Sequence, residues 1–145
     1  MMRYKTSKTD RQPVFFVDRM LGKLAKWLRI IGYDCDYHPT NDHVEIIQLS
    51  RGAGRILLTR DTMLVRRREV GEFLFITSDH LPQQLEQVVT RYGLPPPEQR
   101  YSRCIVCNTR LEPASESEVV FNVSVYVRSH CSEFYTCRAC RRVYW

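Results

Sequence analysis

The stretch FFVDRMLGKLAKWLRIIG, residues 15–32, decides the fold, because a short apolar run ends on an aspartate and leads directly into a helix. Apolar residues in LGKLAKWLRII recur at the spacing of one helical face, and Gly32 ends the helix. Lys23 and Lys26 fall on the opposite face. A buried strand that passes through a polar residue into a helix is typical of a parallel α/β sheet.

The alternation of strand and helix continues to residue 93. Further strands are expected at 33–37, 55–59 and 72–78, and further helices at 41–52, 62–68 and 81–93. In the 41–52 helix, we expect Val44, Ile46 and Ile47 to face the core. The pattern predicts an α/β fold in three layers, with helices on both faces of a parallel sheet.

Composition changes after the segment LPPP, residues 94–97. We therefore expect a flexible leader over 1–13, an α/β domain over 14–97 and a small β module over 98–145. In the last of these, VVFNVSVYV alternates as a strand would. The polar leader has no apolar segment of the secretory kind, and no run of 18 apolar residues occurs, so we expect a cytoplasmic protein without a membrane partner.

The formal net charge of +6 suggests a polyanionic partner but does not identify one. All four lysines lie within the first 26 residues, so no later lysine can bind phosphate or form a Schiff base. The chain also lacks GxGxxG and GxSxG motifs. These absences argue against dinucleotide binding and serine hydrolase chemistry.

Four of the six cysteines form two CxxC pairs, Cys104 with Cys107 and Cys137 with Cys140. Four thiolates are what a closed, structural tetrahedral Zn²⁺ site requires, and a short module with little core of its own needs such a site. A redox dithiol or disulfides are the alternatives. Cys131 is close enough in sequence to compete as a ligand, but Cys131 and Cys35 are both expected to be plain thiols.

Two of the predicted strands end on aspartates, Asp18 and Asp61. The carboxyl ends of parallel strands share one edge, so these carboxylates could meet there and hold a Mg²⁺ or Mn²⁺ ion. Asp42 would be the third ligand. Glu45 and Asp79 are further candidates, either for a second ion or for orienting water. Such a site predicts metal-dependent hydrolysis of a phosphodiester.

Each of these acids has a simpler interpretation as a helix cap. Asp18, Asp61 and Asp79 each precede an expected helix, and Asp42 with Glu45 has nearly the spacing of a capping box. For a single aspartate, capping is the stronger interpretation. The recurrence of aspartate at helix starts along one sheet edge favours the metal site.

Basic side chains could draw in a nucleic-acid backbone. The candidates near the sheet are Lys23, Lys26, Arg29, Arg60 and Arg66, the last of these opening the run to Arg68. In the C-terminal module they are Arg138, Arg141 and Arg142, which lie close to aromatic residues. The alternative for both groups is an ordinary solvated surface.

The blocks FFVDRMLGKLAKWLRIIGYDCDY, NDHVEII, RILLTRDTML, QQLEQVV, CIVCNTRL and CRACRRVYW together resemble the PIN-like RNase family named for the C-terminal domain of the Mut-seven exonuclease. The resemblance covers roughly residues 14–145. It implies a PIN-like α/β/α fold followed by a zinc ribbon, and Mg²⁺- or Mn²⁺-dependent ribonuclease activity. By this resemblance, the family's acidic positions correspond to Asp18, Asp42 and Asp61, and Asp79 is the nearest match to a fourth acidic position.

The leading hypothesis is therefore a ribonuclease that uses one or two divalent ions, with one structural zinc ion and RNA as its partner. Two alternatives remain open. One is a non-catalytic RNA- or ribosome-associated module whose acids only cap helices. The other is a PIN-type toxin or regulator. Substrate, mode of cleavage and oligomeric state are left open by the sequence.

Overall fold

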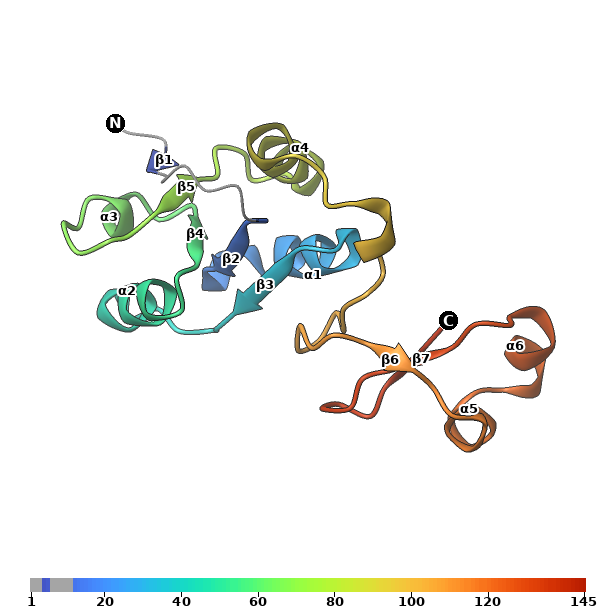
Figure 1. The fold of residues 1–145 in the computed structure, drawn as a ribbon. Helices are drawn as coiled ribbons and strands as arrows, with labels where there is room; N and C mark the ends of the chain where they lie inside the picture. The colour runs from blue at the N-terminus through green and yellow to red at the C-terminus, as the bar shows by residue number, and fades with distance from the viewer. Residues whose placement is uncertain (1–3, 6–11) are drawn as a thin grey trace.

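The computed structural model describes residues 4–5 and 12–145 and places a five-stranded sheet at the centre of the first hundred residues (Figure 1). The strand order is β1-β5-β4-β2-β3, in which four strands are parallel and β1 is antiparallel to β5. The strands are β1 (Tyr4–Lys5), β2 (Val14–Val17), β3 (Asp34–Tyr37), β4 (Ile56–Thr59) and β5 (Phe73–Phe75).

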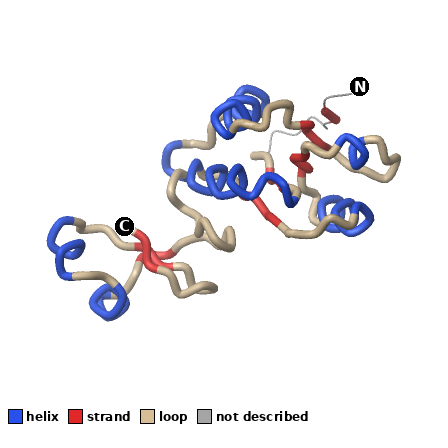
Figure 2. Tube along the Cα trace, turned by 180° about the vertical axis from the view of Figure 1, so that it is seen from behind, coloured by secondary structure: helices blue, strands red, loops and turns tan. Residues whose placement is uncertain are grey.

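Helices connect the four parallel strands and cover both faces of the sheet (Figure 2). They are the 3-10 helix η1 (Arg19–Leu21), α1 (Gly22–Ile31), α2 (His43–Gly52), the short α3 (Thr62–Val65) and α4 (Leu81–Tyr92). The predicted three-layer α/β architecture is confirmed. Two elements are shorter than expected. The 62–68 helix stops at Val65, so the three arginines after it lie outside α3, and the 72–78 strand is limited to Phe73–Phe75.

Alternate residues of the strands supply two separate cores. Phe15 and Leu58 face one side, where they pack with Leu24 and Leu28 of α1 and Val88 of α4. On the other side, Phe16, Leu57 and Phe73 pack with residues of α2 and α3. Parallel strands buried on both faces need continuous apolar runs, which explains the sequences VFFV and ILLT.

Two expectations about this part of the chain, the inward face of Val44 and the flexible leader, differ from the described structure. Val44 does not face the core: its side chain is 51% exposed, whereas Ile46 and Ile47 are buried as expected. Within the expected flexible leader, Tyr4 and Lys5 form β1 along the edge of β5. Residues 1–3 and 6–11 of that leader lie outside the described residues.

The C-terminal part follows the 3-10 helix η2 (Pro97–Gln99) and contains a three-stranded antiparallel sheet. Its strands are β6 (Glu112–Pro113), β7 (Tyr135–Thr136) and β8 (Val143–Tyr144). Between β6 and β7 the chain forms α5 (Glu116–Asn122) and α6 (Val125–His130), which project away from the larger sheet (Figure 1).

The strand expected at VVFNVSVYV is therefore wrong. Ser115 caps α5 in a reciprocal capping box with Glu118, and Ser124 caps α6. Both caps satisfy helix N–H groups and favour two short helices over one strand. Among the described residues, no helix is both long enough and apolar enough to span a membrane.

Candidate active site and metal centre

The topology brings the ends of β2 and β4 together. The chain places β3 on one side of β2 and then crosses to place β4 on the other side. A crevice outside the carboxyl ends of the strands at such a switch point is where ligands bind in open α/β sheets. Asp18 follows β2 and Asp61 follows β4 at this position, and the Asp18 amide donates to the Leu58 carbonyl at 3.1 Å.

The hydroxyl of Thr59 links these two aspartates. Thr59 is fully buried; its Oγ1 donates to Asp18 Oδ2 and accepts from the backbone N–H of Asp61 at 3.0 Å. The other oxygen of Asp18, Oδ1, accepts from the Met20 amide at 2.8 Å. Asp18 is only 3% exposed, so both of its oxygens are held in fixed directions.

Asp61 is held by backbone amides on one side and by a histidine on the other. Its Oδ1 accepts from the amides of Met63 and Leu64, and its Oδ2 lies 2.7 Å from His43 Nε2. Burial raises the pKa of Asp61, but the hydrogen bonds from His43 and from the two amides outweigh burial and hold that pKa below its ordinary value. The carboxylate is therefore ionised at neutral pH.

The third aspartate, Asp42, caps α2 from the loop after β3. Its Oδ1 accepts from the amides of Val44 and Glu45 at 2.9 and 3.3 Å. The Glu45 carboxylate pairs with His38 at 3.1 Å and accepts from Thr40 Oγ1 at 2.8 Å. The neighbouring loop is thus closed by hydrogen bonds, and the Asp42 side chain stands exposed at its end.

Capping is confirmed for Asp18, Asp42 and Asp61, which start η1, α2 and α3. It is wrong for Asp79, because His80 occupies the cap position of α4 and Asp79 is an exposed partner of His80 at 3.4 Å. Over residues 4–5 and 12–145, only the four CxxC cysteines gather three or more metal-ligand atoms within 4.8 Å of one another. The carboxylates share the sheet edge without forming a closed cage.

The candidate basic residues occupy several different environments. Lys23, Lys26 and Arg66 are exposed, whereas Arg60 donates to the Ile76 carbonyl at 3.0 Å. Arg29 is only 5% exposed, and its guanidinium is held between backbone carbonyls. In the C-terminal part, Arg141 and Arg142 are exposed, and Arg138 is paired with Glu112 and Glu118.

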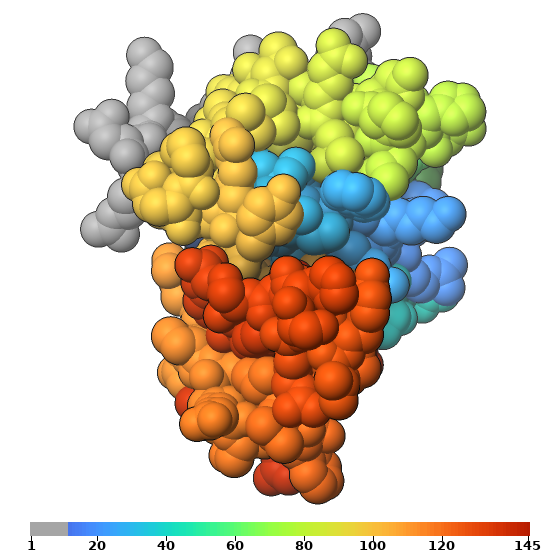
Figure 3. All heavy atoms as spheres, turned by 90° about the vertical axis from the view of Figure 1, so that its right-hand side faces the viewer, coloured from blue at the N-terminus to red at the C-terminus, as the bar shows by residue number. Residues whose placement is uncertain are grey.

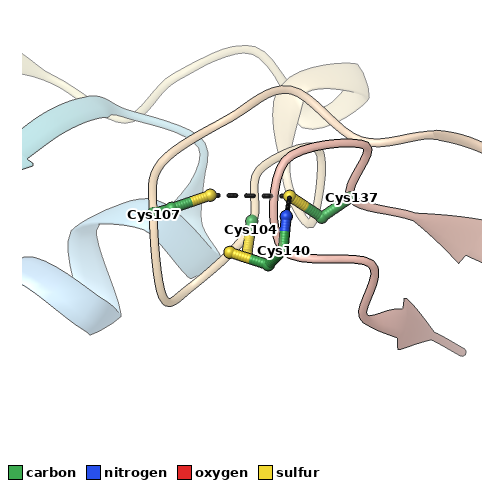
Figure 4. A group of neighbouring side chains, drawn as sticks. All are labelled: Cys104, Cys107, Cys137 and Cys140. Atoms are coloured by element: carbon green, nitrogen blue, oxygen red, sulfur yellow. Dashed lines mark hydrogen bonds between the residues drawn. The ribbon is translucent and has the colours of Figure 1, made fainter.

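The four cysteines of the CxxC pairs converge on one point (Figure 4). Their sulfur atoms all lie within 4.8 Å of one another, and Cys107 Sγ lies 3.5 Å from Cys137 Sγ. Tetrahedral zinc with Zn–S bonds of about 2.3 Å separates its sulfurs by about 3.8 Å, so the cluster could hold a zinc ion. The Tyr144 hydroxyl, 3.0 Å from Cys104 Sγ, adds a polar neighbour to one ligand.

The two CxxC turns have equivalent backbones. After the second cysteine of each turn stands a residue with positive φ, Asn108 at 72° and Arg141 at 60°. In both turns this residue's amide donates back to the first cysteine's carbonyl, at 2.9 Å to Cys104 and 2.7 Å to Cys137. Asparagine tolerates the left-handed region better than arginine does, so the first turn is the less strained of the two.

The first CxxC turn also completes the large sheet. Strand β3 is at the edge of that sheet, and the outward-facing N–H and C=O of Cys35 have no strand to pair with. Asn108 Oδ1 accepts from the Cys35 amide at 2.9 Å, and Arg29 Nε donates to the Cys35 carbonyl at 2.8 Å. The same arginine donates through Nη1 to the carbonyls of Ile105 and Val106.

A charged cluster surrounds this junction. Asp34 Oδ1 accepts from Arg55 Nη1 and from Asn108 Nδ2, both at 2.7 Å, and its Oδ2 lies 3.6 Å from Arg103. Burial raises the pKa of Asp34, but the bonds from Arg55 and Asn108 and the nearby arginine charges lower it below its ordinary value overall. The cysteine cluster is thus tied to β3 by buried polar contacts.

Three residues with evident roles were not singled out from the sequence: His43, Thr59 and Asn108. His43 and Thr59 stand next to the acidic residues in NDH and LLTRD, so their position was a usable signal. Asn108 directly follows a CxxC pair, where a left-handed residue is needed. Its contact with Cys35, 73 residues away, had no local signal.

Comparison with known protein families gives one result. A family model described as the Mut7-C RNAse domain matches residues 13–145. No curated protein and no solved structure matches the chain. The matched range contains all four parallel strands, the three capping aspartates and both CxxC pairs. The match covers nearly the whole chain and points to a nuclease-type function, and the protein therefore belongs to the Mut7-C RNase domain family.

Proposed function

We propose that the protein is a metal-dependent ribonuclease in which Asp18, Asp42 and Asp61 hold one or two Mg²⁺ or Mn²⁺ ions. The observation that carries the proposal is that, in an RNase family chain, aspartates follow three neighbouring parallel strands at the topological switch point. A cap position alone also accepts serine, asparagine or threonine, yet all three positions here carry aspartate.

The donor set fits a hard divalent cation. All three proposed ligands offer carboxylate oxygens, which Mg²⁺ and Mn²⁺ prefer. Asp42 caps α2 through Oδ1, whereas Asp61 would have to exchange its bond to His43 for the ion. When bound, such an ion lowers the pKa of a coordinated water and stabilises the charge that develops on the phosphoryl group.

The other residues of the site would position these ligands. Thr59 fixes the direction of the Asp18 carboxylate, and His43 holds Asp61 in place before an ion arrives. Glu45 and Asp79 are assigned to a second ion or to orienting the attacking water. For RNA contacts we propose the exposed Lys23, Lys26 and Arg66 and the half-buried Arg60 near the sheet, and Arg138, Arg141 and Arg142 in the C-terminal part. The buried position of Arg29 leaves it out of this set.

We further propose that the four cysteines bind one structural zinc ion. A four-thiolate set leaves no open coordination position for catalysis. On this view residues 14–97 form the PIN-like nuclease domain and residues 98–145 a zinc-braced module docked on β3. Metal analysis of the purified protein should find one zinc per chain.

The proposal is tested by RNA cleavage with protein freed of Mg²⁺ and Mn²⁺ but with its zinc content verified. Wild type should cut only after either ion is added, and Asp61→Asn should not cut under any condition. Glu86→Gln, an exposed acid on α4, is the matched control and should cut like wild type. Asp79→Asn tests whether a fourth acid takes part.

One observation favours a second candidate, a non-catalytic RNA- or ribosome-associated module: the three aspartates do cap helices. That candidate predicts RNA binding that needs no divalent ion and survives Asp61→Asn. Equal RNA binding by both proteins, without cleavage by either, would favour it over the nuclease.

A further inference from the structure

One face of α1 leads away from the acidic edge and carries an unusual set of side chains. Lys23, Lys26 and Trp27 lie within about one third of the helix circumference, since residues three and four apart are neighbours on a helix. Both lysines are exposed, and Trp27 is 46% exposed. Met20 in η1 lies between Asp18 and this face along the chain and is 57% exposed.

Packing and helix stability do not explain this face. The core side of α1 is formed by Leu24, Ala25 and Leu28. Within the described part of the chain, Trp27 stacks on no other ring and the two lysines form no ion pair. Lys23 also stands in the first turn of α1, where the helix dipole disfavours a cation.

The sequence from residue 19 to residue 33 contains no acidic residue, so the face is purely basic and apolar. In Figure 3 the blue surface of this region is open between the yellow-green surface of α4 and the red surface of the C-terminal segment. Exposed bases can stack on an aromatic ring while lysines contact the phosphates, and this combination is how proteins bind single strands.

We infer that Met20, Lys23, Lys26 and Trp27, here called the α1 track, bind single-stranded RNA and feed it to the acidic edge. This inference rests on the proposed function and specifies its substrate class. From Met20 to Trp27 the track is about 10 Å long at 1.5 Å per residue, so it contacts only a few nucleotides. A duplex is a poor partner because its bases are already stacked and cannot reach Trp27.

The test is fluorescence anisotropy with a labelled mixed-sequence 12-nucleotide RNA, alone or annealed to its complement. Zinc-loaded protein in the Asp61→Asn background prevents cleavage, and wild type without added Mg²⁺ serves as a repeat. Trp27→Ala should weaken binding of the single strand about tenfold, and Trp27→Phe should restore most of the affinity. The duplex should bind at least about tenfold more weakly than the single strand.

The lysines are tested through the salt dependence of binding. Each phosphate contact on a single strand contributes about 0.7 to the slope of log K against log salt, so Lys23→Gln with Lys26→Gln should reduce the slope by about 1.4. Tyr126→Ala, which removes an exposed aromatic ring from α6 and lies outside the proposed RNA contacts, is the control and should bind like its parent. Circular dichroism checks that each variant is folded.

The inference is overturned if Trp27→Ala binds the single strand as tightly as its parent, if Tyr126→Ala loses as much affinity as Trp27→Ala, or if duplex and single strand bind equally. Its failure is distinct from that of the nuclease proposal. Cleavage that needs Mn²⁺, with unchanged binding by the track variants, would refute only the track. Weakened binding by those variants, without any cleavage by wild type, would refute only the nuclease.

Discussion

Replacement of Asn108 by glycine isolates the contact between the first CxxC turn and the edge of β3. Glycine adopts a φ of 72° without strain, so the change removes the side chain and leaves the turn intact. The buried amide of Cys35 then loses its acceptor, which costs about 1–3 kcal/mol. Asp34 loses one donor but keeps Arg55, at a cost of about 1 kcal/mol.

The two effects together predict a loss of about 2–4 kcal/mol, which lowers the Tm of a chain of this size by about 5–15 °C. Arg141→Gly is the matched control, because Arg141 occupies the equivalent backbone position with an exposed side chain. It should leave Tm unchanged or raise it, since glycine relieves the strain of positive φ. Thermal unfolding of the zinc-loaded proteins, followed by circular dichroism, measures both. Equal Tm shifts in the two variants, or no shift in Asn108→Gly, would refute the reasoning.

Three other outcomes are expected. Thr59→Val keeps the side-chain volume but leaves Asp18 Oδ2 without its donor. It should therefore lower the free energy of unfolding by about 1.5–3 kcal/mol in urea titrations and reduce RNA cleavage. Thr59→Ser should recover the stability and the cleavage. Cys104→Ser should lower the zinc content below one per chain and unfold residues 98–145 as seen by limited proteolysis, whereas Cys131→Ser should do neither. Burial raises the pKa of the Tyr33 hydroxyl to about 12. The contribution of this pKa difference to the free energy of unfolding is therefore complete below pH 10 and is lost as pH rises toward 12. Tyr33→Phe should therefore lose less stability than wild type between pH 10 and 12 in urea titrations, and equal losses would contradict this origin.

The sequence predicts the sheet well because its signals are local. VFFV and ILLT are apolar on both faces, and each of Asp18, Asp42 and Asp61 starts a helix through contacts within three residues. The cysteine cluster is equally predictable, because two CxxC pairs bring four thiolates without any knowledge of the intervening chain.

The errors arise where distant contacts or competing local signals decide. Arg29 resembles a surface cation on a helix, yet besides the Cys35 carbonyl it binds carbonyls 76 and 77 residues later in the chain. The VVFNVSVYV segment has strand-like alternation, but Ser115 and Ser124 provide caps that turn it into two helices. The SESE sequence at 115–118 already carries the capping-box spacing and could have indicated a helix.

The covering of β3 by the first CxxC turn has a consequence for the protein during its synthesis. Until Asn108 leaves the ribosome, the outward-facing N–H of Cys35 lacks its acceptor and is open to pairing with a strand of another chain. At about 5–20 residues per second, the 73 residues between them take about 4–15 s to make. Under the proposed zinc binding, the ion then fixes the first CxxC turn against this edge, so a cell short of zinc should accumulate this protein as aggregates joined through β3.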